Sequence, residues 1–163
     1  MDIQKQQTTP QTRTTTDDEP QVREVLNRYV TAFRAGNIDD LMKLYTEDAV
    51  AFDMMAPLQI VGRDRYRKAW EKGASMMGTP WVYTPRDLRI VAGSDVAFAH
   101  AIVECGGTSK EGKIESGWVR HTLGFRKVDG KWLIAHEQFS VPIDFKDGKA
   151  QACMELKPEE VVH

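Results

Sequence analysis

A tyrosine and an aspartate are the side chains of this sequence that are best suited to proton transfer. Tyr29 lies in a stretch with the apolar pattern of a helix, and Asp53 lies in the short apolar run 49–55. A carboxylate among valine, phenylalanine and methionine loses solvation, which raises its pKa and makes it a better base. A nearby phenol can donate a hydrogen bond to a developing oxyanion. Taken singly, each residue also fits a structural role, as a salt-bridging or loop-capping carboxylate and as a core tyrosine. Together they predict a small-molecule pocket.

The first helix is predicted from its apolar spacing. Between Val22 and Phe33 apolar residues recur every three or four positions, and Gly36 is a typical residue at a helix C-terminus. Tyr29 lies on this apolar stripe. The helix should therefore present Tyr29 and Phe33 to the interior.

Two further helices and a strand are expected before residue 78. The pattern predicts a short helix over about 38–45, a strand over 49–54 and a third helix over about 63–77. After residue 78 the sequence changes to alternating, β-branched segments, at about 82–92, 95–106, 113–128 and 131–142. Asp129-Gly130 between the last two is typical of a two-residue hairpin turn. Helices followed by an antiparallel meander predict an α+β domain with a curved sheet around the helices.

The segments 25–40 and 44–50 resemble the front half of ketosteroid isomerase and, more widely, the NTF2-like superfamily with its SnoaL-like polyketide cyclases. In the isomerase, the oxyanion tyrosine and the base aspartate are separated by the same interval as Tyr29 and Asp53 here. The resemblance therefore implies that Asp53 is a catalytic base and Tyr29 an oxyanion donor. The isomerase's protonated aspartic acid matches a position at or near Thr122, whose hydroxyl can also donate a hydrogen bond.

The segment 127–142 resembles SnoaL-like proteins and ketosteroid isomerase homologues, so the resemblance runs from about residue 22 to 142. It implies an NTF2-like cone, in which three N-terminal helices pack on a curved, mixed and mainly antiparallel sheet. The expected domain spans 20–145. A flexible tail over 1–19 precedes it, and an extension over 146–163 that could add a short edge strand follows it.

Strict alternation along the last two strands assigns their side chains to two faces. One face mixes aromatic and polar residues: Trp118, Arg120, Thr122, His136 and Gln138. We expect this face to point toward the helices and to bind a ligand together with Phe33 and Met54, because apolar walls with a few polar groups are typical of small-molecule sites. Arg120 could hold a ligand anion or pair with Asp53, and His136 could be an acid, a base or a structural residue.

The other face of these strands is an apolar stripe, formed by Val119, Leu123, Phe125, Leu133 and Phe139. Three helices can cover only one side of a sheet, so an apolar stripe on the outer side needs another partner. We therefore expect a homodimer that forms through the outer sheet face.

Composition excludes several classes of partner. The net charge is −2, the pI is about 6.1, and no block of like charges would attract nucleic acid or an anionic membrane. The polar N-terminus has no secretory signal or spanning segment, so a cytoplasmic protein is expected. Cys105 and Cys153 are predicted to be free thiols, although a bridge between them is the alternative. The histidines show no ligand spacing and no phosphate loop is present, so neither a metal nor a cofactor is expected.

These observations lead to two hypotheses about function. The first is a protein that binds an apolar or aromatic ligand of carbonyl or phenol type, with isomerase- or cyclase-like acid–base chemistry if it is an enzyme. The second is an association or oligomerisation domain without turnover. An open cavity that reaches Asp53 would favour the first. A cone closed by Trp118, Phe33 and Met54 would favour the second.

Overall fold

The structure is a computed structural model, and it describes residues 18–151. Its elements, in chain order, are α1 (Asp18–Arg34), α2 (Ile38–Met42), β1 (Tyr45–Phe52), β2 (Ile60–Val61), α3 (Arg63–Ala74), β3 (Gly78–Ala92), β4 (Val96–Thr108), β5 (Ile114–Val128) and β6 (Lys131–Ser140). The strands form one sheet in the order β2-β1-β6-β5-β4-β3. The β1–β6 pair is parallel, and every other neighbouring pair is antiparallel. The predicted α+β class and the mixed, mainly antiparallel sheet are confirmed.

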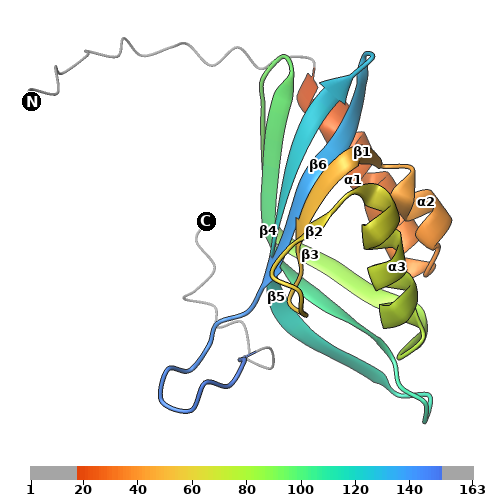
Figure 1. Cartoon of the computed structure of the whole chain (residues 1–163), viewed down its shortest axis with the longest axis vertical. Coiled ribbons are helices and arrows are strands. Elements are labelled where there is room, and N and C mark those ends of the chain that lie inside the picture. Colours follow the sequence, from red (N-terminus) through yellow and green to blue (C-terminus); the bar gives the residue numbers. More distant parts are fainter. Residues whose placement is uncertain (1–17, 152–163) are drawn as a thin grey trace, which may run out of the picture.

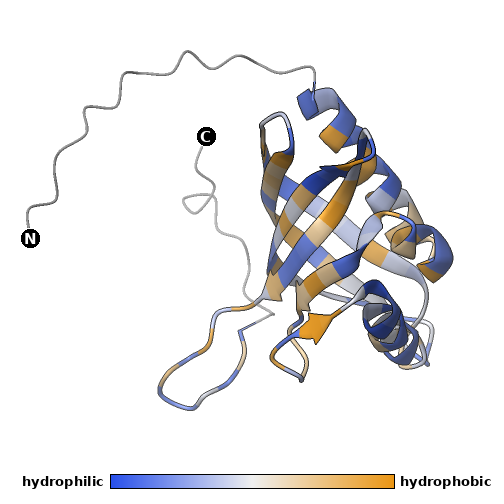
Figure 2. Ribbon diagram, turned by 45° about the horizontal axis from the view of Figure 1, so that its top comes forward, coloured by the Kyte–Doolittle hydropathy of each residue, from blue (hydrophilic) through white to orange (hydrophobic). Residues whose placement is uncertain are grey.

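The sheet is curved, and the three helices cover one of its faces (Figure 1). The core lies between the helices and this concave face. Figure 2 shows apolar and polar residues alternating along the strands, as expected where one sheet face is buried and the other meets solvent.

Helix α1 forms as its apolar spacing predicts. Its stripe from Val22 to Phe33 is buried, with Tyr29 completely enclosed at 0% exposure. The helix ends at Arg34 and is followed by Gly36, whose φ of 63° is left-handed and whose N–H bonds to the Phe33 carbonyl. The Asn37 side chain then accepts from a backbone N–H of α2 and caps that helix.

Strand β1 begins earlier than the sequence pattern predicts. The predicted second helix over 38–45 ends at Met42, and Tyr45 already belongs to β1, where it pairs with Ile134 of β6. Long-range pairing with β6 overrides the local helical spacing, because a strand buried on the concave face gains more packing than another helical turn would. The strand also ends earlier than predicted, at Phe52 instead of 54, so Asp53 follows the last residue of β1.

The later strands agree with the predicted meander to within a few residues. Asp129 and Gly130 both have positive φ, 50° and 76°, which is the two-residue turn expected between β5 and β6. The two-residue strand β2 was not predicted, because a segment so short has no readable period.

The predicted assignment of faces in β5 and β6 is wrong. Val119, Leu123, Phe125 and Phe139, expected on the outside, are buried in the single chain beneath the helices, and Leu133 is half-buried. In β5 the more apolar set simply belongs to the core. In β6 a bulge interrupts the alternation, since Gly124 pairs with His136 but Phe125 pairs with Ile134. The extra residue between these pairs lets Trp132 and Ile134 share the concave face with Glu137 and Phe139.

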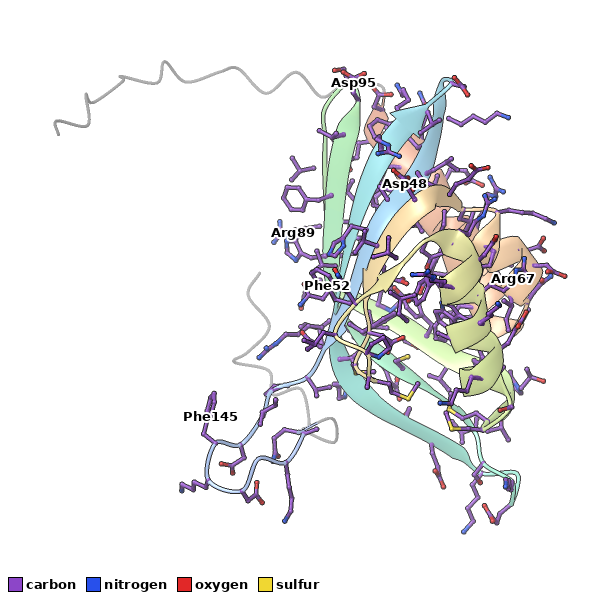
Figure 3. The ribbon with its side chains drawn as sticks, viewed as in Figure 1. Asp48, Phe52, Arg67, Arg89, Asp95 and Phe145 are labelled. Atoms are coloured by element: carbon purple, nitrogen blue, oxygen red, sulfur yellow. The ribbon has the colours of Figure 1, made fainter. Side chains whose placement is uncertain are left out.

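After β6 the chain forms a small loop that projects from the body, with Phe145 at its outer part (Figure 3). Ile143 and Ala150 form an isolated bridge across it. The edge strand predicted within the extension would continue beyond residue 151, which lies outside the described residues. The predicted flexible tail covers residues 1–19, and the structure describes only its last two, Asp18 and Glu19, which already belong to α1. The rest of the tail lies outside the described residues.

Candidate functional site

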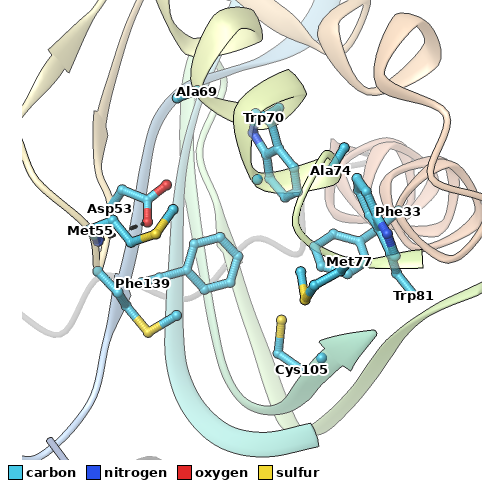
Figure 4. Close-up of a pocket in the computed structure, with 13 residues that line it drawn as sticks. Phe33, Asp53, Met55, Ala69, Trp70, Ala74, Met77, Trp81, Cys105 and Phe139 are labelled. Atoms are coloured by element: carbon cyan, nitrogen blue, oxygen red, sulfur yellow. Dashed lines mark hydrogen bonds between the residues drawn. The ribbon is translucent and has the colours of Figure 1, made fainter. Parts of the chain in front are cut away.

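A cavity of about 130 Å³ opens between α3, the end of β1 and the concave face of the sheet (Figure 4). Its walls are almost entirely apolar, with aromatic rings, thioethers and small residues. They are formed by Phe33, Asp53, Met54, Met55, Ala69, Trp70, Gly73, Ala74, Met77, Trp81, Cys105, Gly106 and Phe139. The cavity is half-open to solvent and is therefore accessible to a small molecule.

Asp53 is the carboxylate in the wall of this cavity. Its Oδ1 accepts a hydrogen bond from the Met55 backbone N–H at 3.2 Å, which holds the side chain at the mouth. Burial raises the pKa of Asp53 above its usual value, and the nearby charge of Glu137 raises it further, against the opposing effect of hydrogen bonds from the backbone of Met55 and Met54. A carboxylate of raised pKa beside an apolar space is suited to accept a proton from a bound molecule.

A second carboxylate, Glu137, is completely buried behind the cavity and is 1% exposed. Its Oε2 accepts hydrogen bonds from the hydroxyls of Tyr45, at 2.8 Å, and Tyr66, and its Oε1 lies 2.8 Å from His121 Nε2. Burial alone would raise the pKa of Glu137, but the hydrogen bonds from His121, Tyr66 and Tyr45 and the charge of His121 outweigh it, so the pKa is lowered. Glu137 is therefore ionised at neutral pH.

His121 links Glu137 to a third tyrosine. Its Nδ1 lies 2.6 Å from the Tyr83 hydroxyl, so the imidazole bridges the two side chains. The ring also stacks on Phe139, which lines the cavity. These contacts place a fully bonded polar network directly behind an apolar wall.

Tyr29 lies in this buried region and does not line the cavity. Its ring packs against Tyr83 and His121, with centroids 5.4 and 5.6 Å away. Its hydroxyl makes no hydrogen bond of standard geometry, although it lies close enough to Tyr45 to affect the pKa of that phenol. Burial raises the pKa of Tyr29 well above its usual value, so the phenol stays neutral. The structure does not bring Tyr29 and Asp53 to a common space.

Three residues predicted for the pocket do line it: Phe33, Asp53 and Met54. The five residues predicted from β5 and β6 do not, because the corrected faces turn them outward: Trp118, Arg120, Thr122, His136 and Gln138. On that outer face the Nδ1 of His136 donates to the Val50 carbonyl, and its ring packs against Phe52. Thr122 pairs with Gln138, and no ion pair joins Arg120 to Asp53 among the described residues.

Several residues of the site were not predicted as ligand-binding. Trp70, Gly73 and Met77 recur at three- and four-residue spacing, which places them on one side of a helix. Cys105 lies two residues from the buried Val103 and so shares its strand face. The sequence therefore held signals for these four residues. No signal in the sequence pointed to Glu137, because the bulge in β6 leaves no mark in the pattern of residue types.

Within residues 18–151, no group of three or more histidine, cysteine or acidic side chains is arranged to hold a metal ion. Burial raises the pKa of Cys105 to about 12, with smaller contributions from Glu137 and Asp53, so its sulfur is a protonated thiol in the cavity wall. In the same described part of the chain, no helix is long and apolar enough to cross a membrane.

The cone of three helices on a curved sheet has close structural counterparts. An NTF2-like protein of unknown function from Pseudomonas putida KT2440 superposes with a TM-score of 0.79 and 32% identity, over 88% of this chain and 99% of that one. A ketosteroid isomerase-like protein from Erwinia carotovora atroseptica SCRI1043 has a TM-score of 0.66 and 22% identity, over 77% of this chain and 96% of the other. A candidate scytalone dehydratase from Novosphingobium aromaticivorans DSM 12444 has a TM-score of 0.67 and 18% identity, over 77% of this chain and 85% of the other.

These likenesses define the class as an NTF2-like α+β cone. A family model for the SnoaL-like domain matches residues 22–144. The chain therefore belongs to the SnoaL-like domain family, as the resemblance in its sequence indicated. No curated protein is similar enough in sequence to give a significant match.

Proposed function

We propose that the cavity binds a flat apolar or aromatic molecule with a carbonyl or phenol oxygen, and that Asp53 accepts a proton from it. One observation carries the proposal: a half-open apolar cavity contains a single carboxylate, and burial raises the pKa of that carboxylate. In such a site Asp53 would take a proton from the carbon next to a carbonyl.

The predicted oxyanion donor needs revision under this proposal. Tyr29 is enclosed outside the cavity, so a ligand in contact with Asp53 would not reach its hydroxyl. The thiol of Cys105 lines the cavity and stays protonated, and it can donate a weak hydrogen bond to an enolate oxygen. We propose Cys105 for that role. The cytoplasmic location and the lack of a cofactor that we expect from the sequence stay predictions.

The test is proton exchange on a flat ketone that fits the proposed class, 2-tetralone. NMR in deuterated buffer follows the loss of its α-protons with and without protein. We expect the protein to accelerate the exchange, and Asp53→Asn to slow the accelerated rate by about 100-fold or more, the usual contribution of a general base.

A matched control is Asp95→Asn, which makes the same change in an exposed aspartate at the turn between β3 and β4, far from the cavity (Figure 3). It should leave the exchange rate unchanged. Equal acceleration by the Asp53→Asn variant would show that Asp53 is not the base.

We also propose that the outer sheet face forms a homodimer, but through residues other than the stripe first predicted. Phe52, Val91 and Phe98 lie on this face and are 39%, 51% and 47% exposed in the single chain. Val91 and Phe98 are neighbours across β3 and β4, and Phe52 lies on β1, with β6 and β5 between it and β4. Large apolar side chains exposed on one sheet face are typical of a protein interface. Light scattering coupled to gel filtration should give a dimer that Phe98→Glu converts to a monomer. A monomeric parent protein would contradict the proposal.

A further inference from the structure

The cavity wall carries negative charge and no positive charge. Among the described residues, the lining contains the carboxylate of Asp53 but no lysine, arginine or histidine. The groups that shift the pKa of Asp53 are likewise burial, Glu137 and backbone hydrogen bonds, with no basic side chain. A negatively charged ligand group would therefore meet a carboxylate in a poorly solvated space, without a cation to pair with it.

A second carboxylate lies directly behind this wall. Strands β1 and β6 run parallel, with Ala51 paired to Glu137 and Phe52 paired to Gln138. Asp53 follows Phe52 in the chain and lines the cavity together with Phe139. Glu137 lies two residues before Phe139 on the same buried face of β6. Glu137 is buried and held by Tyr45, Tyr66 and His121, so its charge is screened little by solvent. The charge of His121 offsets part of it, and the charge of Glu137 still raises the pKa of Asp53.

The basic side chain of the network is not available to a ligand. His121 bonds to Glu137 on one side, and its ring stacks on Phe139, which separates it from the cavity. Four aromatic side chains also line the space: Phe33, Trp70, Trp81 and Phe139. Aromatic rings attract a cation that approaches their faces.

We propose that the cavity selects its ligand by charge, and that it takes an apolar or aromatic molecule bearing a protonated amine, in preference to a neutral one and against carboxylates and phosphates. One oxygen of the Asp53 carboxylate pairs with the ammonium group and the other stays available for the proton transfer proposed above. Glu137 strengthens the selection from behind the wall without touching the ligand. This inference rests on the proposed function, because it names the charge class of the ligand for the same cavity.

Three ligands that share one ring system test the inference: 2-naphthylmethylammonium, 2-naphthol and 2-naphthoate, titrated calorimetrically into the full chain at neutral pH. We expect the ammonium compound to bind at least about tenfold more tightly than the carboxylate, with the neutral naphthol between them. Asp53→Asn and Glu137→Gln should each reduce this ratio by about threefold or more. Asp95→Asn changes the net charge equally but lies far from the cavity, so it should leave the ratio unchanged.

Equal affinities for the three ligands, or tighter binding of the carboxylate, would overturn the inference while leaving a ligand-binding cavity. Failure of all three to bind would overturn the proposed function and the inference with it. If Glu137→Gln does not fold, Asp53→Asn still decides the matter, because Asp53 is outside the buried network. If the ratio of ammonium to carboxylate affinity is unchanged in Asp53→Asn, the Asp53 carboxylate is not what selects the ligand by charge.

Discussion

The imidazole ring of His121 lies flat against the phenyl ring of Phe139, with 4.0 Å between the centroids and 3° between the ring planes. One ring belongs to the network around Glu137, and the other lines the cavity. The stack is the closest ring contact between the buried polar centre and the wall of the cavity, and Tyr83 with Phe33 and Tyr66 with Trp70 form two others. It holds Phe139 in one orientation, with its other side available to a flat molecule.

The first prediction tests this wall. Phe139→Leu keeps an apolar side chain but loses the aromatic face, so a flat ligand such as 2-naphthol should bind about three- to tenfold more weakly, as expected for the loss of an aromatic pair. Calorimetric titration measures the effect. Met77→Leu is the control, because it changes another lining residue without removing an aromatic ring. Equal losses in both variants would contradict a specific role for the Phe139 ring.

The second prediction concerns the tyrosines around Glu137. Tyr66→Phe removes a hydrogen bond to a buried carboxylate, and it should lower the free energy of unfolding by about 1.5–3 kcal/mol, with Tyr45→Phe close behind. Tyr29→Phe is the matched control in the same core, because the Tyr29 hydroxyl makes no hydrogen bond of standard geometry. It should leave the free energy nearly unchanged. Urea unfolding measures all three, and an equally large loss for Tyr29→Phe would count against the network.

The third prediction is a pH dependence with a definite sign. Asp53 has a raised pKa in the folded chain, so its ionisation disfavours folding at neutral pH, and this cost disappears as the pH falls below its usual value of 3.8. Asp53→Asn should therefore be more stable than the parent at neutral pH, with the difference vanishing in acid. Glu137 has the opposite sign: its lowered pKa stabilises the fold above its usual value of 4.5, and this stability is lost in acid.

Urea unfolding of the parent and of Asp53→Asn between about pH 3 and about pH 8 measures this difference. The midpoint of the change should lie above 3.8, because the pKa of the folded state is raised. An Asp53→Asn variant that is less stable than the parent at neutral pH would contradict the raised pKa.

The fourth prediction compares one substitution at two glycines of the cavity wall. A Cβ at Gly73 in α3 would meet nothing within 4 Å, so Gly73→Ala should stabilise the helix by about 0.5–1 kcal/mol. A Cβ at Gly106 would lie 2.0 Å from the backbone oxygen of Glu115, so Gly106→Ala should cost about 1–3 kcal/mol or more. Thermal unfolding measures both, and the same sign for both would be evidence against the close approach of β4 and β5 at Gly106.

Much of this protein was determined by local pattern. The stripe from Val22 to Phe33 forms its helix because a 3.6-residue period of apolar side chains can be buried only in that way. Asp129-Gly130 turns the chain because both positions need positive φ. The family resemblance also predicted the cone-shaped fold. The apolar run around Asp53 indicated the residue that is the one ionised side chain of the cavity wall.

The tertiary structure decided which faces of β5 and β6 meet the helices, and with them the chemistry of the interior. A bulge beside Gly124 reverses the alternation in β6, so Glu137 and Phe139 point inward while His136 and Gln138 point outward. The interval between Tyr29 and Asp53 in the sequence predicted that both face one pocket, but in the tertiary structure only Asp53 lines the cavity. The physical reason is that side-chain direction in a strand depends on register, and register is set by pairing between strands distant in sequence, where one extra residue turns every later side chain to the other face.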